Sequence, residues 1–290
     1  MKKRIFLYLS VSFGLLVAYI LVNFYTVPPP ADLQNSRPIP IEQTVLMEDL
    51  TWMEIRDLVN SGHDTVILPT GGIEQNGPFV VTGKHNYIVA EIAKRAAETL
   101  KNTLVAPVVK LVPQGSHSPP SGHMHYPGTI GLSTGTFESV IEEIVKSLEL
   151  HGFKHIVLIA DSGGNLASLD KVSAKIQKLG EKNFSAQVHH VTDYYLKDKW
   201  SYNFLKELGI TQIPDVHSAK RGEVHSDYHY ESMLAAIDPN LIRADARLQE
   251  DMLTINEVSM VPLSNTIANG NKLIQFRVNI LVDAINLISN

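Results

Sequence analysis

The residues best suited to chemistry form four short polar clusters, and the first surrounds Glu74. It runs from Gly71 to Pro78, and Lys84 and His85 follow shortly after it. Glycines permit a tight loop that presents Glu74 inward, and a histidine near a helix start could meet it at a metal ion. Alternatively, Glu74 caps a helix or pairs with Lys84, and His85 only begins a helix. The sequence is compatible with either role.

The second cluster is rich in histidine. His117, His123 and His125 lie close together and precede Tyr126. Imidazole nitrogens are common metal ligands, but the prolines and glycine between these histidines also fit a plain surface loop. Both interpretations stay open.

The third cluster, from Asp161 to Asn165, follows an apolar run at residues 155–160. An acidic residue at the end of a buried strand suits a metal ion or a substrate amine, and the adjacent glycines permit close approach of backbone to ligand. Asp161 or Ser162 could instead cap a helix. A nucleophilic Ser162 would indicate a serine hydrolase, but no G-x-S-x-G elbow surrounds it.

The fourth cluster concentrates ionisable residues between Glu223 and Glu231. Glu223, His225, Asp227 and His229 alternate along the chain, which places their side chains on one side of an extended segment. Glu231 then opens a helical stretch. Burying these charges together requires a cation or mutual pairing, so this cluster also predicts a functional site.

The segments between the clusters predict an α/β fold with a mostly parallel sheet covered by helices. Apolar runs with strand character occupy residues 65–68, 104–109 and 155–160. Apolar stripes at helical spacing occupy residues 88–100, 140–148, 166–179 and 272–288. Thr136 is the expected cap of the second helix. Ligand sites of open parallel sheets form beyond the carboxyl ends of strands, so the loops that follow strands are the best candidates.

The N-terminus differs from the rest of the chain. Lys2, Lys3 and Arg4 precede an apolar run from Ile5 to Phe24, roughly the 20 residues that a membrane helix needs. The charges predict a cytoplasmic N-terminus and a domain on the periplasmic or extracellular side. A cleaved signal peptide is the alternative. We therefore expect an anchor helix at residues 1–26, a proline-containing tether at 27–45 and an α/β domain at 46–290.

Composition excludes several classes of protein. The chain has 290 residues, of which 44% are hydrophobic, enough for one substantial core. Its net charge of -5 gives no reason to expect a nucleic-acid partner. Cysteine is absent, which rules out disulfides and thiolate chemistry.

In their order, the clusters resemble the motifs of the creatininase family from about Leu46 to Ile288. The stretch 68–78 is similar to the family's first metal motif, which usually ends Glu-Gln-His-Gly-Pro-His. Tyr126-Pro127-Gly128-Thr129 is similar to Phe-Pro-Gly-Thr, and Ser162-Gly163-Gly164-Asn165 to the end of Asn-Gly-His-Gly-Gly-Asn. His225 with Glu231-Ser232-Met233-Leu234 is similar to His-Ala-Gly followed by Glu-Thr-Ser.

The resemblance implies a doubly wound three-layer sandwich with helices on both faces of the sheet, commonly assembled as a homohexamer. It also implies hydrolysis of linear or cyclic amide C–N bonds at a two-metal centre of zinc or manganese. Glu74 is retained from the family's ligands. Asn76, His85 and Ser162 stand where the family has a histidine, a bridging aspartate and another histidine.

The resulting hypothesis is a metal-dependent hydrolase that cleaves an amide or cyclic amide C–N bond of a small molecule. The expected ligands of one or two zinc or manganese ions are Glu74, His85, Asp161 and Glu231. Glu74 and His225 are the expected catalytic residues, with His225 carrying a proton to the leaving nitrogen. The expected substrate-binding residues are Asn76, His123, Tyr126, Gly163 and Gly164, the two glycines through their backbone amides.

Two other functions are compatible with the sequence. The first is a ligand-binding module on the same fold that does not turn its ligand over. The second is a serine hydrolase centred on Ser162. The expected partners are a small amide, the membrane through the N-terminal helix, and further copies of the chain.

Overall fold

The structure is a computed structural model that describes residues 31–180, 184–196, 198–212 and 227–288. The chain divides into two compact units, Met1–Pro40 and Ile41–Asn290. The described part of the first unit contains a 3-10 helix, η1 (Ala31–Gln34). The predicted membrane helix lies outside the described residues. None of the helices in the described part is long and apolar enough to cross a bilayer.

The second unit begins slightly before the predicted boundary at Leu46. Its first residues are tied to the domain by backbone hydrogen bonds: Glu42 N donates to Glu54 Oε1 at 2.6 Å, and Val105 N donates to Val45 O at 2.8 Å. The end of the predicted tether is therefore part of the folded domain.

The domain is built on a parallel sheet with the strand order β2-β1-β3-β4. The strands are β1 (Thr65–Thr70), β2 (Thr103–Val105), β3 (His155–Ala160) and β4 (Gln187–His190). In the register of the sheet, Thr65 lies opposite both Thr103 and His155. The predicted second strand at 104–109 is shorter than expected. Pro107 lacks the N–H that a sheet ladder needs, and Val109 forms only an isolated bridge to Thr70.

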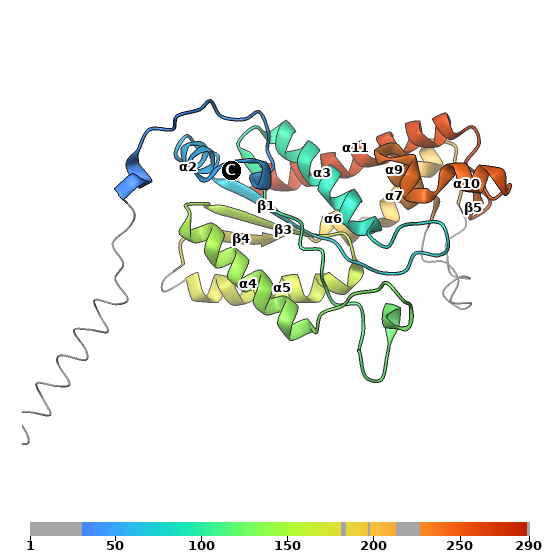
Figure 1. Cartoon of the computed structure of the whole chain (residues 1–290), viewed down its shortest axis with the longest axis horizontal. Coiled ribbons are helices and arrows are strands. Elements are labelled where there is room, and N and C mark those ends of the chain that lie inside the picture. The colour runs from blue at the N-terminus through green and yellow to red at the C-terminus, as the bar shows by residue number, and fades with distance from the viewer. Residues whose placement is uncertain (1–30, 181–183, 197, 213–226, 289–290) are drawn as a thin grey trace, which may run out of the picture. The chain divides into compact units, whose positions relative to one another are not determined.

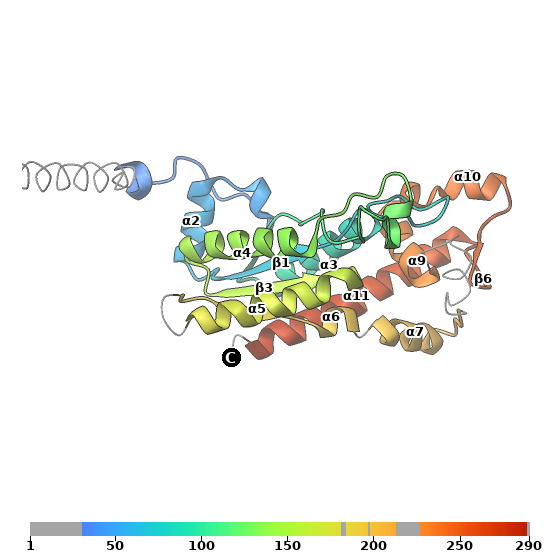
Figure 2. The same cartoon turned by 90° about the horizontal axis from the view of Figure 1, so that it is seen from below.

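Helices cover both faces of this sheet, which confirms the predicted α/β fold (Figures 1 and 2). The core against one face includes residues of α2 (Trp52–Asn60), α4 (Thr134–Leu150) and α5 (Leu166–Gly180). The core against the other includes residues of α3 (Lys84–Leu100), α6 (Asp193–Leu196), α7 (Asp198–Glu207), α9 (Tyr228–Ile237) and α11 (Leu263–Ile288). The remaining elements are η2 (Met47–Asp49), η3 (Gly122–His125), η4 (Gly163–Asn165), η5 (Pro239–Ile242), α10 (Ala244–Gln249), β5 (Thr254–Ile255) and β6 (Val258–Ser259).

The strands are apolar on both sides because each face of the sheet has its own core. Side chains alternate along a strand, so Val66 and Leu68 pack on the α4 and α5 side while Ile67 packs on the α3 side. Strands buried on both faces need continuous apolar runs, which is the pattern that predicted β3.

Three local predictions are corrected by the structure. Helix α4 is capped by Ser133, whose Oγ accepts the N–H of Thr136 at 3.2 Å, so Thr136 is not the cap. Helix α11 starts at Leu263, before the expected Lys272, and a Cβ at Gly270 would lie 1.8 Å from Ser232 O of α9, so this polar turn packs closely against α9. His229 lies in α9 rather than in an extended segment.

Candidate active site

The candidate site lies where strands β1 and β3 end. Glu74 follows β1, and Asp161 comes directly after β3. Because the two strands are adjacent and parallel, their carboxyl ends meet, and Asp161 N donates to Thr70 O at 3.0 Å. His85 enters from the first turn of α3. The structure thus brings together three of the predicted site residues.

His85 links the two carboxylates. Its Nδ1 lies 2.7 Å from Asp161 Oδ2 and its Nε2 lies 2.8 Å from Glu74 Oε1, and all three side chains are at most 3% exposed. An ionised carboxylate only accepts hydrogen bonds, so the two contacts together favour the doubly protonated, imidazolium form of His85. Burial and the charge of Lys84 oppose this form. The charge of Glu74 and the hydrogen bonds to both carboxylates outweigh them and raise the pKa of His85.

Two buried cations accompany the carboxylates. Lys84 Nζ lies 4.0 Å from Glu74 Oε1, and Arg277 Nη1 donates to Asp161 Oδ1 at 3.3 Å. Both cationic side chains are 1% exposed. Burial lowers the pKa of Lys84, against the opposing pull of Glu74 and Asp161. The pairing of Lys84 with Glu74 was one of the two interpretations of the first cluster, and the geometry supports it.

Two aromatic residues complete this centre. Tyr194 Oη donates to Asp161 Oδ1 at 2.9 Å, and burial together with the charge of Asp161 raises the pKa of Tyr194 well above its usual value. The ring of Tyr230 lies 4.7 Å from Lys84 Nζ and 5.6 Å from the guanidinium carbon of Arg277. An aromatic face attracts cations, so Tyr230 stabilises both charges.

Arg277, Tyr194 and Tyr230 were not predicted as site residues from the sequence. The sequence does contain a signal for Arg277, because it is a charged residue within the apolar stripe of α11. In the structure Arg277 is 1% exposed. A charge on a core-facing position requires a buried partner, which here is Asp161. Tyr194 and Tyr230 carried no such signal because tyrosine is common in ordinary cores.

The glycine loop is shaped by its contact with α3. Asn86 Oδ1 accepts the N–H of Gly72 at 2.9 Å, and a Cβ on Gly71 would lie 2.1 Å from the same oxygen. Only a glycine at position 71 allows this close approach. The loop and the first turn of α3 are therefore held together, which fixes Glu74 beside His85.

The partly exposed side of the centre faces the histidine-rich loop. His123 Nε2 lies 3.7 Å from Glu74 Oε2, and the His123 side chain is 25% exposed while that of Glu74 is 1% exposed. His123 N donates to Gln114 O at 3.1 Å, which anchors the loop. Tyr126 follows on the surface, 36% exposed. Of the predicted substrate-binding residues, His123 therefore lies next to Glu74.

Asn76, Gly163 and Gly164 have local structural contacts. Asn76 Nδ2 donates to Glu74 O at 3.0 Å and to Val81 O at 3.1 Å, which fixes the loop that carries Glu74. A Cβ on Gly163 would lie 3.0 Å from Tyr195 Oη, and one on Gly164 would lie 2.9 Å from Pro113 O. Their predicted roles in substrate binding stay predictions.

Two carboxylates of the fourth cluster, Glu231 and Asp227, accept hydrogen bonds from residues outside the cluster. Glu231 is 2% exposed, and its Oε2 accepts a hydrogen bond from Arg247 Nη1. Asp227 accepts a hydrogen bond from Tyr202 Oη at 2.6 Å. His225 lies outside the described residues, so its catalytic role stays a prediction.

The described residues do not fit a bound divalent metal. No group of three histidine, aspartate or glutamate side chains in the described part of the chain is arranged to hold one. Contacts of 2.7 and 2.8 Å between His85 and the carboxylates are shorter than the roughly 3.4 Å that separates two ligand atoms around tetrahedral zinc. The predicted ligand roles of Glu74, His85, Asp161 and Glu231 stay predictions.

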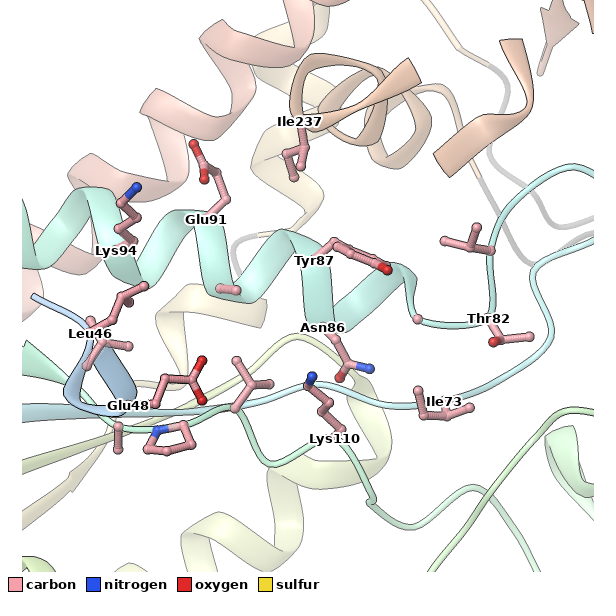
Figure 3. A pocket seen from close by; sticks show the side chains of 17 residues that line it. Leu46, Glu48, Ile73, Thr82, Asn86, Tyr87, Glu91, Lys94, Lys110 and Ile237 are labelled. Carbon is pink, nitrogen blue, oxygen red and sulfur yellow. The ribbon is translucent and has the colours of Figure 1, made fainter. Parts of the chain in front are cut away.

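A separate pocket of about 600 Å³ lies against another side of α3 (Figure 3). It is bordered by α3, the segment after β2 and the region around Leu46. Its labelled charged residues are Glu48, Glu91, Lys94 and Lys110. Glu74, His85 and Asp161 do not line it, so the pocket and the buried centre are two distinct features.

Comparisons with known proteins point to one family. The family model described as creatininase, creatinine amidohydrolase, matches residues 48–271. A creatinine amidohydrolase from Pseudomonas putida is 25% identical over 228 residues, which cover 77% of this chain and 83% of that protein. A 3-dehydro-scyllo-inosose hydrolase from Thermotoga maritima is 25% identical over 119 residues, which cover 41% of this chain and 36% of that protein.

Solved structures of creatininase share the fold. A mutant creatininase superposes with a TM-score of 0.62 at 22% identity and covers 84% of this chain and 98% of its own. A manganese form has a TM-score of 0.60 and a mutant of the Zn-Zn type one of 0.59, each at 22% identity over 84% of this chain and 98% of its own. The neighbours thus include zinc and manganese forms.

Proposed function

The chain belongs to the creatininase family, and we propose on that basis that it hydrolyses an amide or cyclic amide C–N bond of a small molecule. The family match over residues 48–271 and the structural neighbours support an amidohydrolase. Site chemistry rather than fold decides the reaction, so the proposal depends on what Glu74 can do.

One observation carries the proposal: the position of the Glu74 carboxylate. Its Oε1 is fixed by His85 at 2.8 Å, and its Oε2 lies 3.7 Å from the partly exposed His123. One oxygen is thus oriented by the protein while the other faces the partly exposed side. A general base needs this combination, because it must be held in place and still reach a water molecule.

The reaction we propose uses Glu74 as both base and acid. Glu74 Oε2 takes a proton from water as the water oxygen bonds to the amide carbonyl carbon. The C–N bond then breaks, and the proton passes to the leaving nitrogen. The chain of contacts from Glu74 through His85 to Asp161 holds the carboxylate in position throughout. Contributions from His225, Tyr126 and the amides of Gly163 and Gly164 are proposed on sequence similarity alone.

The test is turnover by the purified full chain on a panel of small cyclic and linear amides, creatinine included. We expect release of amine and carboxylate from at least one compound. Glu74→Gln should lower the rate by about 100-fold or more, because an amide side chain is not a base. The matched control is Glu98→Gln, a glutamate of α3 whose side chain is 52% exposed and which should keep full activity. Equal rates for Glu74→Gln and the unmodified chain would refute the role of Glu74.

A second candidate function is a ligand-binding module without turnover. It is favoured by the engagement of both carboxylates, Glu74 and Asp161, with Lys84, His85 and Arg277. A compound that raises the melting temperature of the chain but is recovered unchanged after incubation would support this function. A compound that is hydrolysed would exclude it for that compound.

The location and assembly of the protein are also proposals. We propose that the apolar run from Ile5 to Phe24 anchors the domain to a membrane on the side away from the cytoplasm, and that the domain forms a homo-oligomer. Membrane fractionation with protease accessibility tests the first, and sedimentation of the purified protein in detergent tests the second. Alkaline extraction of the protein from the membrane would contradict the anchor.

A further inference from the structure

We infer that Lys84 and Arg277 are built-in counter-ions that neutralise Glu74 and Asp161 in place of a divalent metal. The structural neighbours include zinc and manganese forms, whereas this centre has its own positive charges. The inference goes beyond the proposed reaction, because it concerns what neutralises the carboxylates whether or not an amide is hydrolysed.

The two cations lie beside different carboxylates. Lys84 approaches Glu74, and Arg277 approaches Asp161, so each carboxylate has a cation of its own. The cations come from α3 and α11, on opposite ends of the domain sequence, and Tyr230 of α9 lies against both. Three helices thus contribute side chains to one buried group of charges, which distinguishes it from an isolated ion pair on the surface.

Both of these ion pairs are buried. The side chains of the two pairs are each at most 1% exposed: Lys84 with Glu74, and Arg277 with Asp161. Buried charges of this kind are tolerated only when opposite charges balance them. Lys84, Arg277 and the protonated His85 supply the positive charge that balances the two carboxylates here. A divalent metal on Glu74 Oε1 would lie within about 6 Å of Lys84 Nζ, and in a buried setting the two would repel each other strongly.

The contacts between His85 and the two carboxylates are short. His85 contacts Asp161 and Glu74 directly through its two nitrogens, at hydrogen-bond distances. A metal inserted at either contact would have to push the atoms apart, and the buried Tyr194 and Tyr230 surround this centre. Among the described residues, the direct contacts of His85 thus leave no gap for a metal between it and either carboxylate.

The first experiment measures metal content. The full chain is purified in detergent, incubated with zinc and manganese, desalted and analysed for elements. We expect far less than one ion per chain and no change of melting temperature on adding a chelator. One or two ions retained per chain would overturn the inference. This measurement needs no variant, so it holds even if a substitution prevents folding.

The second experiment asks whether Lys84 stands in for a metal. Lys84→Ala removes the cation and leaves a cavity beside Glu74. We expect manganese or zinc to raise the melting temperature of this variant by about 4 °C or more and to leave the unmodified chain unchanged. The matched control is Lys94→Ala on the same helix, whose side chain is 46% exposed and which should show no shift. Equal shifts in all three proteins, or none in Lys84→Ala, would contradict the inference.

The metal and turnover experiments can fail separately. Turnover without retained metal supports both proposals. Turnover that requires retained metal keeps the proposed hydrolase and overturns the inference. A metal-free chain that hydrolyses nothing keeps the inference and removes the hydrolase.

Discussion

Two groups of ion pairs differ in their contact distances and in their exposure to water. Between α4 and α5, Lys171 Nζ lies 2.6 Å from Glu138 Oε2 and Lys175 Nζ lies 2.7 Å from Glu142 Oε1, with lysine side chains 67% and 54% exposed. In the centre at the ends of β1 and β3, the paired side chains are nearly inaccessible. The lysine contact there is longer, at 4.0 Å. The exposed pairs thus have the shorter contacts, and the pairs with the longer contacts are the buried ones.

The two groups of ion pairs differ in how strongly the protein's stability depends on them. Exposed pairs are screened by water and contribute little to the free energy of unfolding. Buried charges carry a large desolvation cost, so each depends on its partner. We expect substitutions in the centre to be severe and substitutions between α4 and α5 to be mild.

The largest expected effect comes from Asp161→Asn. The change leaves Arg277 and His85 without their buried carboxylate, so the free energy of unfolding should fall by about 3–5 kcal/mol. Urea denaturation followed by circular dichroism measures it. Asp170→Asn is the matched control, because Asp170 also lies 2.7 Å from a histidine, His190, but is 59% exposed. Equal losses in the two variants would remove the distinction between the groups.

Tyr194→Phe should have a smaller effect. It removes the hydroxyl that donates to Asp161 at 2.9 Å and keeps the ring, so we expect a loss of about 1–3 kcal/mol in the free energy of unfolding. Tyr87→Phe, at a side chain 46% exposed, should change it by less than about 0.5 kcal/mol. A loss of the same size in both variants would show that the hydrogen bond to Asp161 has no special weight.

The stability contributed by His85 should depend on pH in one direction. Its folded pKa is raised above the ordinary 6.5, so the folded state holds the proton more tightly than the unfolded state. The stabilisation is fully present below about pH 6.5 and is lost as pH rises through the folded pKa. The difference in free energy of unfolding between the unmodified chain and His85→Gln should therefore shrink with rising pH. A difference that grows with pH would contradict the protonated His85.

The smallest expected effect is that of Lys175→Ala. This pair with Glu142 is exposed, so the free energy of unfolding should change by less than about 1 kcal/mol, and added salt should reduce even that. Thermal denaturation at low and high salt measures both. A loss as large as that of Asp161→Asn would show that exposure does not set the weight of these pairs.

The sequence predicted the fold more completely than the site. The parallel sheet with helices on both faces is confirmed, because strands buried on two faces and helices buried on one have distinct apolar patterns. Boundaries were less accurate where a local feature intervened, such as Pro107 after β2 and the polar first turns of α11.

The positions of Glu74, His85 and Asp161 followed from the sequence, but their partners did not. Loops after adjacent parallel strands must meet, which brought Glu74 and Asp161 together. Arg277 and Tyr194 reach Asp161 from distant parts of the chain, and no local pattern specifies such tertiary contacts. Charge balance was the missing constraint: two buried carboxylates require cations, and α3 and α11 supply them.

The most direct test of the account is turnover of a chelator-treated full chain compared with chelator-treated Glu74→Gln on a substrate found in the amide panel. We expect the chelated unmodified chain to keep its rate, because Lys84 and Arg277 balance the carboxylates, and Glu74→Gln to lose about 100-fold or more. Loss of turnover on chelation, with recovery on adding zinc or manganese, would contradict it.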